Sequence, residues 1–130
     1  MKILVGYRGT NVGRDLLSLA RNHALAFNSS VIVITSLEGG EKTKGELIAD
    51  VEQNLETARA FFQDQDIPCE THLLIRGNTP GEDIVMYARD AGVDEIIIGV
   101  KSRSKVGKLI FGSTAQYVIL QADCPVTTLK

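Results

Sequence analysis

The sequence has few of the residues that build metal sites or disulfide frameworks. Its 130 residues include two cysteines, two histidines, three prolines and no tryptophan. Cys69 and Cys124 lack CxxC spacing, and a four-ligand Cys/His zinc site would need both of them together with His23 and His72. We therefore predict no metal site, and we interpret both cysteines as small, buried apolar residues in a reducing compartment. His23 falls on the apolar stripe of a predicted helix, which favours a packed, hydrogen-bonded side chain over a ligand or a base.

The sequence also lacks a long apolar run and a strong excess of one charge. No segment approaches the roughly 18 apolar residues of a membrane span, and residues 3–5 lead into a polar turn without a signal-peptide core. A count of 14 Lys and Arg against 16 Asp and Glu leaves a net charge of −2. This balance argues against a surface that binds nucleic acid or an acidic membrane. We expect a cytoplasmic protein that binds neither.

Short β-branched runs alternate with amphipathic stretches along the chain, and the length fits one domain over residues 1–130. Apolar runs of strand length predict five strands, at 2–7, 31–37, 69–75, 94–100 and 125–129. The first is apolar enough to be buried on both faces. Helical spacing and start signals predict four helices, beginning near residues 11, 43, 79 and 112. The fold class is therefore α/β, with a parallel, doubly wound five-stranded sheet covered by helices on two faces.

Three of the predicted helices begin with a sequence typical of a capping box, in which a Ser or Thr side chain and a Glu or Gln side chain satisfy free backbone N–H groups. The three pairs are Thr43 with Glu46, Thr79 with Glu82, and Ser113 with Gln116. Pro80 stands at the first helical position, where its missing N–H does no harm. These signals predict where the helices start.

The most informative segment combines a basic loop with a helix start. Residues 101–108 carry four cations, Lys101 and Arg103 among them, and no acid. After the loop, a helix opens whose N–H groups and dipole favour an anion, at Gly112, Ser113 and Thr114. The combination indicates a phosphate group. The alternative is a solvated loop followed by an ordinary capped helix.

Two common nucleotide-binding motifs are absent. Leu109 follows Gly107-Lys108 where a Walker A motif has Ser or Thr for Mg²⁺. The Gly-x-Gly-x-x-Gly fingerprint of dinucleotide-binding proteins is missing from the strand–helix junctions. The sequence therefore predicts neither of these two classes.

Strand order indicates where a ligand would bind. If the strands take the order 3-2-1-4-5, the connections leave the first and fourth strands in opposite directions, and ligands bind outside the carboxyl ends at that point. The residues there are Tyr7, Arg8, Gly9 and Thr10 after the first strand, and Gly99, Val100, Lys101 and Ser102 after the fourth. The same order places the two cysteines at opposite edges of the sheet, which argues against a disulfide between them.

The chain resembles the single-domain universal stress proteins over nearly its whole length. The resemblance rests on KILVGYRGT at the first strand, GNTPGEDIVMYARDAGVDEIIIGV through the fourth, and GSTAQYVILQADCPV at the C-terminal end. It is also similar to the nucleotide-binding subgroup, which has Gly-x-x-Gly, nine residues and then Gly-Ser/Thr after the fourth strand. Here Gly99-x-x-Ser102 is followed by nine residues and Gly112-Ser113.

The resemblance implies an adenine nucleotide, ATP or AMP with or without Mg²⁺, as a regulatory ligand of a stress-response protein. It places Gly99 and Ser102 against ribose and phosphate, and Ser36 against the adenine. The phosphates would be received by Gly112, Ser113 and Thr114. The family also implies a homodimer formed through the strand Val126–Leu129, whose pairing would hide an open sheet edge.

Two residues depart from the family pattern. Ser102 replaces the second glycine of the motif, and Arg8 stands where ATP-binding members have an Asp. Arg8 can pair with a phosphate or occupy the pocket and favour a different anion. The alternative interpretation is a family member that binds no nucleotide and acts as a dimeric protein-interaction module.

The predicted pocket has no residues that indicate catalysis. It contains no His, no Cys and no close pair of carboxylates, and Asp15 is the acid nearest in sequence to the first strand's loop. A serine without a neighbouring base is a weak nucleophile. We therefore expect a binding protein rather than an enzyme, with slow nucleotide hydrolysis as the most that the site could catalyse.

Overall fold

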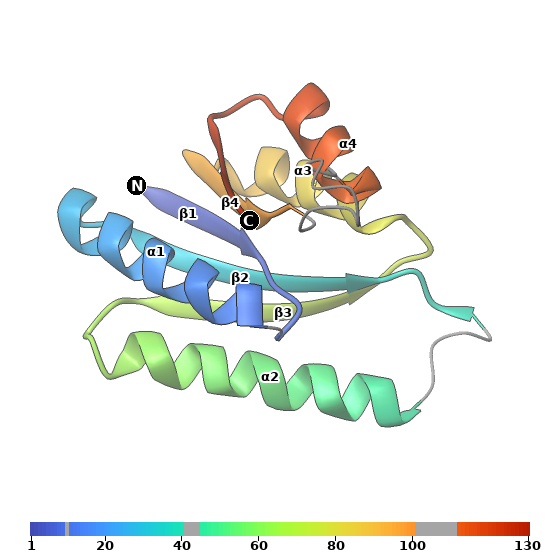
Figure 1. The fold of residues 1–130 in the computed structure, drawn as a ribbon, viewed down its shortest axis with the longest axis horizontal. Helices are drawn as coiled ribbons and strands as arrows, with labels where there is room; N and C mark the ends of the chain where they lie inside the picture. The colour runs from blue at the N-terminus through green and yellow to red at the C-terminus, as the bar shows by residue number, and fades with distance from the viewer. Residues whose placement is uncertain (10, 41–44, 101–111) are drawn as a thin grey trace, which may run out of the picture.

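A computed structural model describes residues 1–9, 11–40, 45–100 and 112–130. These residues form five strands and four helices that alternate along the chain (Figure 1). In chain order they are β1 (Lys2–Gly6), α1 (Asn11–Phe27), β2 (Ser30–Leu37), α2 (Gly45–Gln63), β3 (Cys69–Ile75), α3 (Pro80–Ala91), β4 (Glu95–Gly99), α4 (Ser113–Gln121) and β5 (Val126–Leu129).

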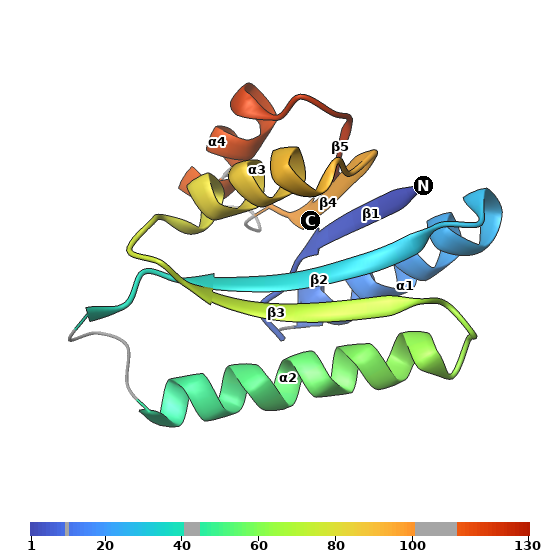
Figure 2. The same cartoon turned by 180° about the vertical axis from the view of Figure 1, so that it is seen from behind.

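The five strands form one parallel sheet in the order β3-β2-β1-β4-β5, which confirms the predicted fold class. Helices α1 and α2 cover one face of the sheet and α3 and α4 cover the other, as Figures 1 and 2 show from opposite sides. The connections therefore diverge between β1 and β4. At this point the carboxyl ends of the strands and the amino ends of the helices meet.

The core lies in two layers on either side of β1. Ile3 and Val5 are buried against the apolar faces of α1 and α2, whereas Leu4 between them is buried in the layer under α3 and α4. All three side chains have no exposed surface. The alternation of a β-strand thus places consecutive apolar residues in both layers, as the continuous apolar run predicts.

The histidine and cysteine residues of the sequence analysis lie in or beside the regular elements of the fold. Nδ1 of His23 lies 2.9 Å from Oε1 of Glu95, and the hydroxyl of Thr127 donates to Oε2 of Glu95 at 2.6 Å. His23 is therefore hydrogen-bonded as predicted, and its partner comes from β4. Cys69 and Cys124 are free thiols near opposite edges of the sheet, and both are only partly buried, so the interpretation of them as buried residues is wrong. Burial raises the pKa of the Cys69 thiol to about 11.

No helix within the described part of the chain has the length and apolar character to span a membrane.

One of the three capping boxes is confirmed. The hydroxyl of Thr79 accepts the Glu82 N–H at 3.3 Å, and Oε1 of Glu82 accepts the Thr79 N–H at 2.9 Å. The prediction for Ser113 is wrong, because α4 begins at Ser113 itself and the N-cap is Gly112, which has no side chain to cap with. Thr43 lies outside the described residues.

We expect Thr79→Ala to lower the free energy of unfolding by about 1 kcal/mol, because the substitution removes the N-cap oxygen of α3. The hydrogen bonds from Thr79 lower the pKa of Glu82. A lowered carboxyl pKa stabilises the fold above the ordinary pKa of Glu, and this contribution is lost as the pH falls through the folded-state pKa. The difference between the two proteins should therefore shrink in acid, as urea unfolding at several pH values would measure.

Thr57→Ala is the matched control. The Thr57 hydroxyl donates to the Gln53 carbonyl inside α2. The substitution therefore removes a hydroxyl and a methyl group from a helix, as Thr79→Ala does, but it removes no cap. Equal losses of stability in the two variants would contradict the role assigned to Thr79.

Candidate functional site

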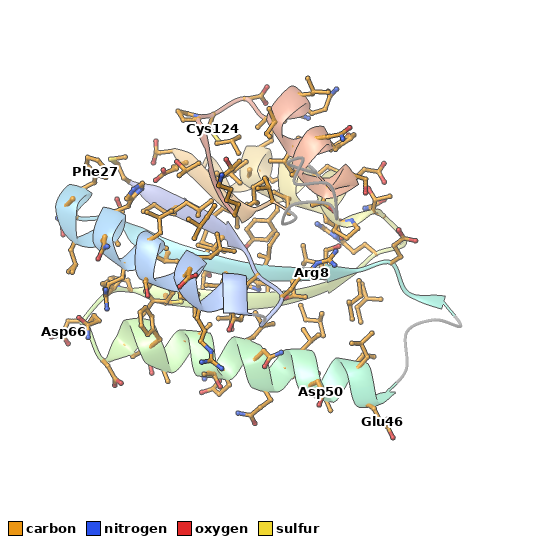
Figure 3. All side chains as sticks on the ribbon, in the orientation of Figure 1. Arg8, Phe27, Glu46, Asp50, Asp66 and Cys124 are labelled. Carbon is orange, nitrogen blue, oxygen red and sulfur yellow. The ribbon has the colours of Figure 1, made fainter. Side chains whose placement is uncertain are left out.

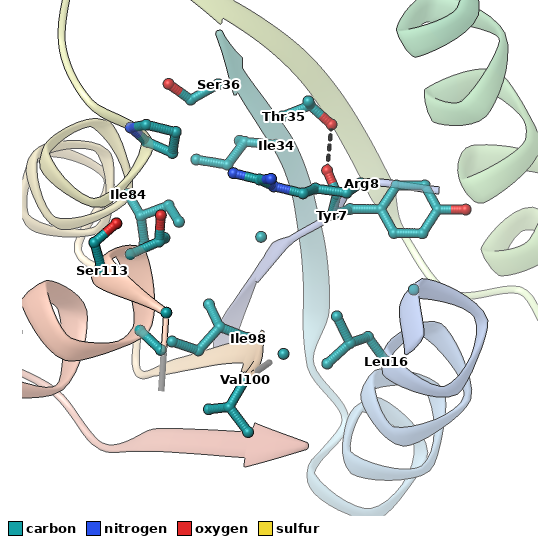
Figure 4. Close-up of a pocket in the computed structure, with 17 residues that line it drawn as sticks. Tyr7, Arg8, Leu16, Ile34, Thr35, Ser36, Ile84, Ile98, Val100 and Ser113 are labelled. Atoms are coloured by element: carbon teal, nitrogen blue, oxygen red, sulfur yellow. Dashed lines mark hydrogen bonds between the residues drawn. The ribbon is translucent and has the colours of Figure 1, made fainter. Parts of the chain in front are cut away.

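A cavity of about 340 Å³ opens where the connections of the sheet diverge (Figure 4). Its walls come from the ends of three neighbouring strands and from the first turns of three helices. The lining residues are Gly6, Tyr7 and Arg8 at β1, Ile34, Thr35 and Ser36 of β2, Ile98, Gly99 and Val100 at β4, Gly13 and Leu16 of α1, Pro80 and Ile84 of α3, and Gly112, Ser113, Thr114 and Ala115 at α4. A small molecule can therefore contact six elements at once.

The cavity brings together most of the predicted site residues that the structure describes. They are Tyr7, Arg8, Ser36, Gly99, Val100, Gly112, Ser113 and Thr114. Gly9 is not among the lining residues. Its φ is +74°, and a Cβ there would lie 2.3 Å from Nδ2 of Asn54, so its role is to let the chain turn beside α2. Thr10, Lys101, Ser102 and Arg103 lie outside the described residues, and their predicted roles stay predictions.

The amino end of α4 forms a polar wall of the cavity. Gly112 is extended, with φ −67° and ψ 162°, and the first bond of the helix runs from the Gln116 N–H to the Gly112 carbonyl at 3.0 Å. The N–H groups of Ser113, Thr114 and Ala115 precede this bond and have no acceptor inside the helix. All three residues line the cavity. This wall can therefore receive an anion, with the helix dipole adding to the attraction.

Arg8 supplies the charge of the cavity. It follows β1 at the carboxyl end of the sheet (Figure 3), and it is the one charged side chain among the described lining residues. In Figure 4 its guanidinium reaches across the cavity beside Ile34. The lining contains no described acid, His or Cys, and nowhere in the described chain do three or more His, Cys, Asp or Glu gather to hold a metal. The cavity is thus suited to an anionic ligand with an apolar part.

The ladder between β1 and β2 ends inside the cavity. In β2, the Val31 N–H donates to the Pro68 carbonyl, on the β3 side, at 2.9 Å. Backbone groups alternate in direction along a strand, so the N–H and carbonyl of even-numbered residues such as Ser36 point toward β1. The Tyr7 N–H donates to the Ile34 carbonyl at 2.9 Å. In a continuing ladder the next bond would join the Ser36 N–H to the Tyr7 carbonyl.

The Thr35 side chain donates to the Tyr7 carbonyl, the acceptor that the next ladder bond would use. Its buried hydroxyl donates to the Tyr7 carbonyl at 2.6 Å, the dashed line in Figure 4. The Ser36 N–H has no acceptor among the described residues, and Ser36 lines the cavity. A backbone edge that can pair with a ligand is therefore left open. Sequence reasoning missed Thr35, although a hydroxyl residue at the end of an apolar strand was an available signal.

A buried carboxylate lies directly behind the cavity wall and was also missed. Asp83 of α3 is completely buried, and its Oδ2 accepts the Ser36 hydroxyl at 2.5 Å. Asp15 is the acid nearest in sequence to the loop after β1, but Asp83, far along the chain, contacts a residue that lines the cavity. The available signal was an acid next to Ile84 on the apolar face of the predicted third helix. Asp83 itself does not line the cavity.

Fold and site together define a doubly wound α/β protein with a cavity at the switch point of its sheet. The model of the Universal stress protein family matches residues 1–130, and the chain belongs to this family.

Three relatives show the extent of the similarity. A universal stress protein of Thermus aquaticus is 28% identical, over 98% of this chain and 97% of its own length. A solved structure of a universal stress protein from Archaeoglobus fulgidus has a TM-score of 0.90 and 36% identity, covering 99% of this chain and 97% of that one. A structure of the universal stress protein from the same organism in complex with dAMP has a TM-score of 0.83 and 31% identity, covering 99% and 96%.

We expect Thr35→Val to lower the free energy of unfolding by about 1–3 kcal/mol. The substitution keeps the side-chain shape but leaves the buried Tyr7 carbonyl without its donor. Thr35→Ser is the control, because it retains the hydroxyl while losing one methyl group. Chemical denaturation of the three proteins measures the difference. A valine variant as stable as the unaltered protein would contradict a stabilising role of this hydrogen bond.

Proposed function

We propose that the protein binds an adenine nucleotide in the cavity and acts as a ligand-regulated module of the stress response. The observation that carries the proposal is the uncapped amino end of α4, which faces the same cavity as the guanidinium of Arg8. Backbone N–H groups at a helix start and an arginine fork are both suited to phosphate oxygens. The dAMP complex of the relative from Archaeoglobus fulgidus supports the choice of an adenine nucleotide.

The remaining walls suit the nucleoside. Ile34, Ile84 and Ile98 supply apolar surface that can pack against a flat base. Ser36 offers its backbone N–H and carbonyl on the β1 side, where a base edge can take the place of the missing strand partner. The ligand would thus lie with its base toward β2 and its phosphate toward α4.

We propose AMP or ATP as the ligand. Mg²⁺ fits only as a companion of the phosphates, because the described lining residues contain no carboxylate that could hold it. For the same reason no described lining residue can act as a base toward Ser113, and we propose binding without turnover. The free thiols suit a reducing compartment, and we propose the cytoplasm.

Ser113→Asp should separate ligand binding from stability. A carboxylate at the first position of α4 interacts favourably with the helix dipole, so stability should be unchanged or higher by about 0.3–1 kcal/mol. The same charge repels a phosphate at the cradle, so the affinity for AMP should fall by at least about tenfold. Ser113→Asn, which has nearly the same shape and no charge, is the control. Calorimetric titration and thermal unfolding give the two quantities.

The unaltered protein decides the proposal itself. A ligand at about a hundred times its dissociation constant should stabilise the fold by about 2.7 kcal/mol. We expect a thermal shift with AMP, ADP or ATP, with or without Mg²⁺. If none of these nucleotides at millimolar concentration produces a shift or a heat of binding, the dimeric interaction module without a nucleotide becomes the better interpretation.

We also propose a homodimer through β5, which is the outer strand next to β4. The Val100 N–H donates to the Leu129 carbonyl at 2.8 Å, so the backbone N–H and carbonyl groups of odd-numbered β5 residues point toward β4. The backbone N–H of Thr128 therefore points away from the sheet. An open edge of this kind is a template for a second copy.

Thr128→Pro removes the outward N–H and should convert the dimer to a monomer without breaking the pairing of β5 with β4. Thr128→Val keeps the N–H and is the control. Sedimentation measures the mass of each protein. An unaltered protein that sediments as a monomer at every concentration would rule out the dimer.

A further inference from the structure

Asp83 is an unusual residue for its surroundings. It is completely buried on α3, next in sequence to the buried apolar residue Ile84, and it is not among the residues that line the cavity. Burying a carboxylate is unfavourable unless hydrogen bonds replace its water. Even a well-paired buried charge contributes little stability compared with an apolar residue of the same size. A role in holding geometry explains this carboxylate better than a role in stability.

The hydrogen bonds of Asp83 join three segments that are far apart in the sequence. Oδ2 accepts the hydroxyl of Ser36 from the end of β2 at 2.5 Å. Oδ1 accepts Nε of Arg76 at 3.2 Å and Nδ2 of Asn78 at 3.1 Å, both from the loop after β3. The carboxylate therefore ties the end of β2 to the start of α3 and to the preceding loop.

Ser36 links this carboxylate to the cavity. The Ser36 hydroxyl donates its single hydrogen to Oδ2 of Asp83, so this hydrogen is not available to a ligand. In Figure 4 the hydroxyl oxygen of Ser36 points away from the Arg8 side of the cavity. What Ser36 offers to a ligand is its backbone edge, past the point where β1 stops pairing with β2. The side chain is the anchor, and the backbone is the recognising group.

We propose that Asp83 is a positioning residue that sets the base preference of the cavity through Ser36. The inference rests on the proposed binding of an adenine nucleotide. A 6-aminopurine presents a ring-nitrogen acceptor beside an amino donor, whereas a 6-oxopurine presents an N–H donor beside a carbonyl acceptor. A backbone edge fixed in one place matches only one of these orders, and the other order leaves polar groups unpaired. Holding Ser36 still is therefore what allows the cavity to distinguish the two bases.

The test compares AMP with IMP, which differ in this base edge, by calorimetric titration. The unaltered protein should bind AMP at least about tenfold more tightly than IMP. Asp83→Asn and Ser36→Ala should each weaken AMP binding about tenfold and bring the AMP-to-IMP ratio of affinities close to one. Ser36→Ala leaves Arg76 and Asn78 on the carboxylate, so it tests the idea even if Asp83→Asn does not fold.

Thr79→Ala is the control for a purely structural effect. It weakens the start of the same helix but does not remove any side-chain contact of Asp83. It should lower the melting temperature and keep the AMP-to-IMP ratio of the unaltered protein. If Asp83→Asn and Ser36→Ala also keep that ratio, Asp83 is merely structural and the inference is wrong.

Failure of the inference and failure of the proposed function are distinguishable. An unaltered protein that binds neither AMP nor IMP overturns the proposed function, and this inference with it. An unaltered protein that binds AMP and IMP equally well overturns the inference alone.

Discussion

The site depends on where the pairing of β1 with β2 stops. The register runs from Lys2 with Ser30 to Gly6 with Ile34, and the Tyr7 N–H adds one last bond. The hydroxyl of Thr35 then takes the Tyr7 carbonyl at 2.6 Å. β2 continues beside β3 as far as Leu37. One edge of β2 is thus left without a strand, and an unpaired backbone edge attracts polar partners.

The parallel topology supplies the rest of the cavity at the same end. Because all the strands are parallel, each crossover returns the chain so that the strands end and the helices begin at one end of the sheet. β1 and β4 are neighbours, but their following helices, α1 and α4, lie on opposite faces (Figure 1). Neither α1 nor α4 therefore covers the gap between their ends. The first residues of α4 and Arg8 line the same cavity here, although they are about a hundred residues apart in the sequence.

The parts of the site that follow from local sequence were predictable. Arg8, Gly99 and Gly112 to Thr114 were identified because they follow or begin regular elements and because strand order determines where such ends meet. Thr35 and Asp83 were missed because their roles depend on Tyr7 and Ser36, partners 28 and 47 residues away. Ser113 shows the opposite error. It fits a local capping pattern, but the helix starts one residue earlier than that pattern requires, so the N–H groups face the cavity uncapped.

Arg8 and Asp83 lie near the same cavity but differ in burial. A carboxylate exposed in the cavity would repel a phosphate at the amino end of α4. Asp83 is instead fully buried behind Ser36 and is paired with Arg76, whose side chain is 41% exposed. Arg8 has no such partner among the described residues and lines the cavity itself. The cavity therefore presents the guanidinium of Arg8 to a ligand. The carboxylate of Asp83, which holds the cavity wall in place, is buried and hydrogen-bonded inside the fold.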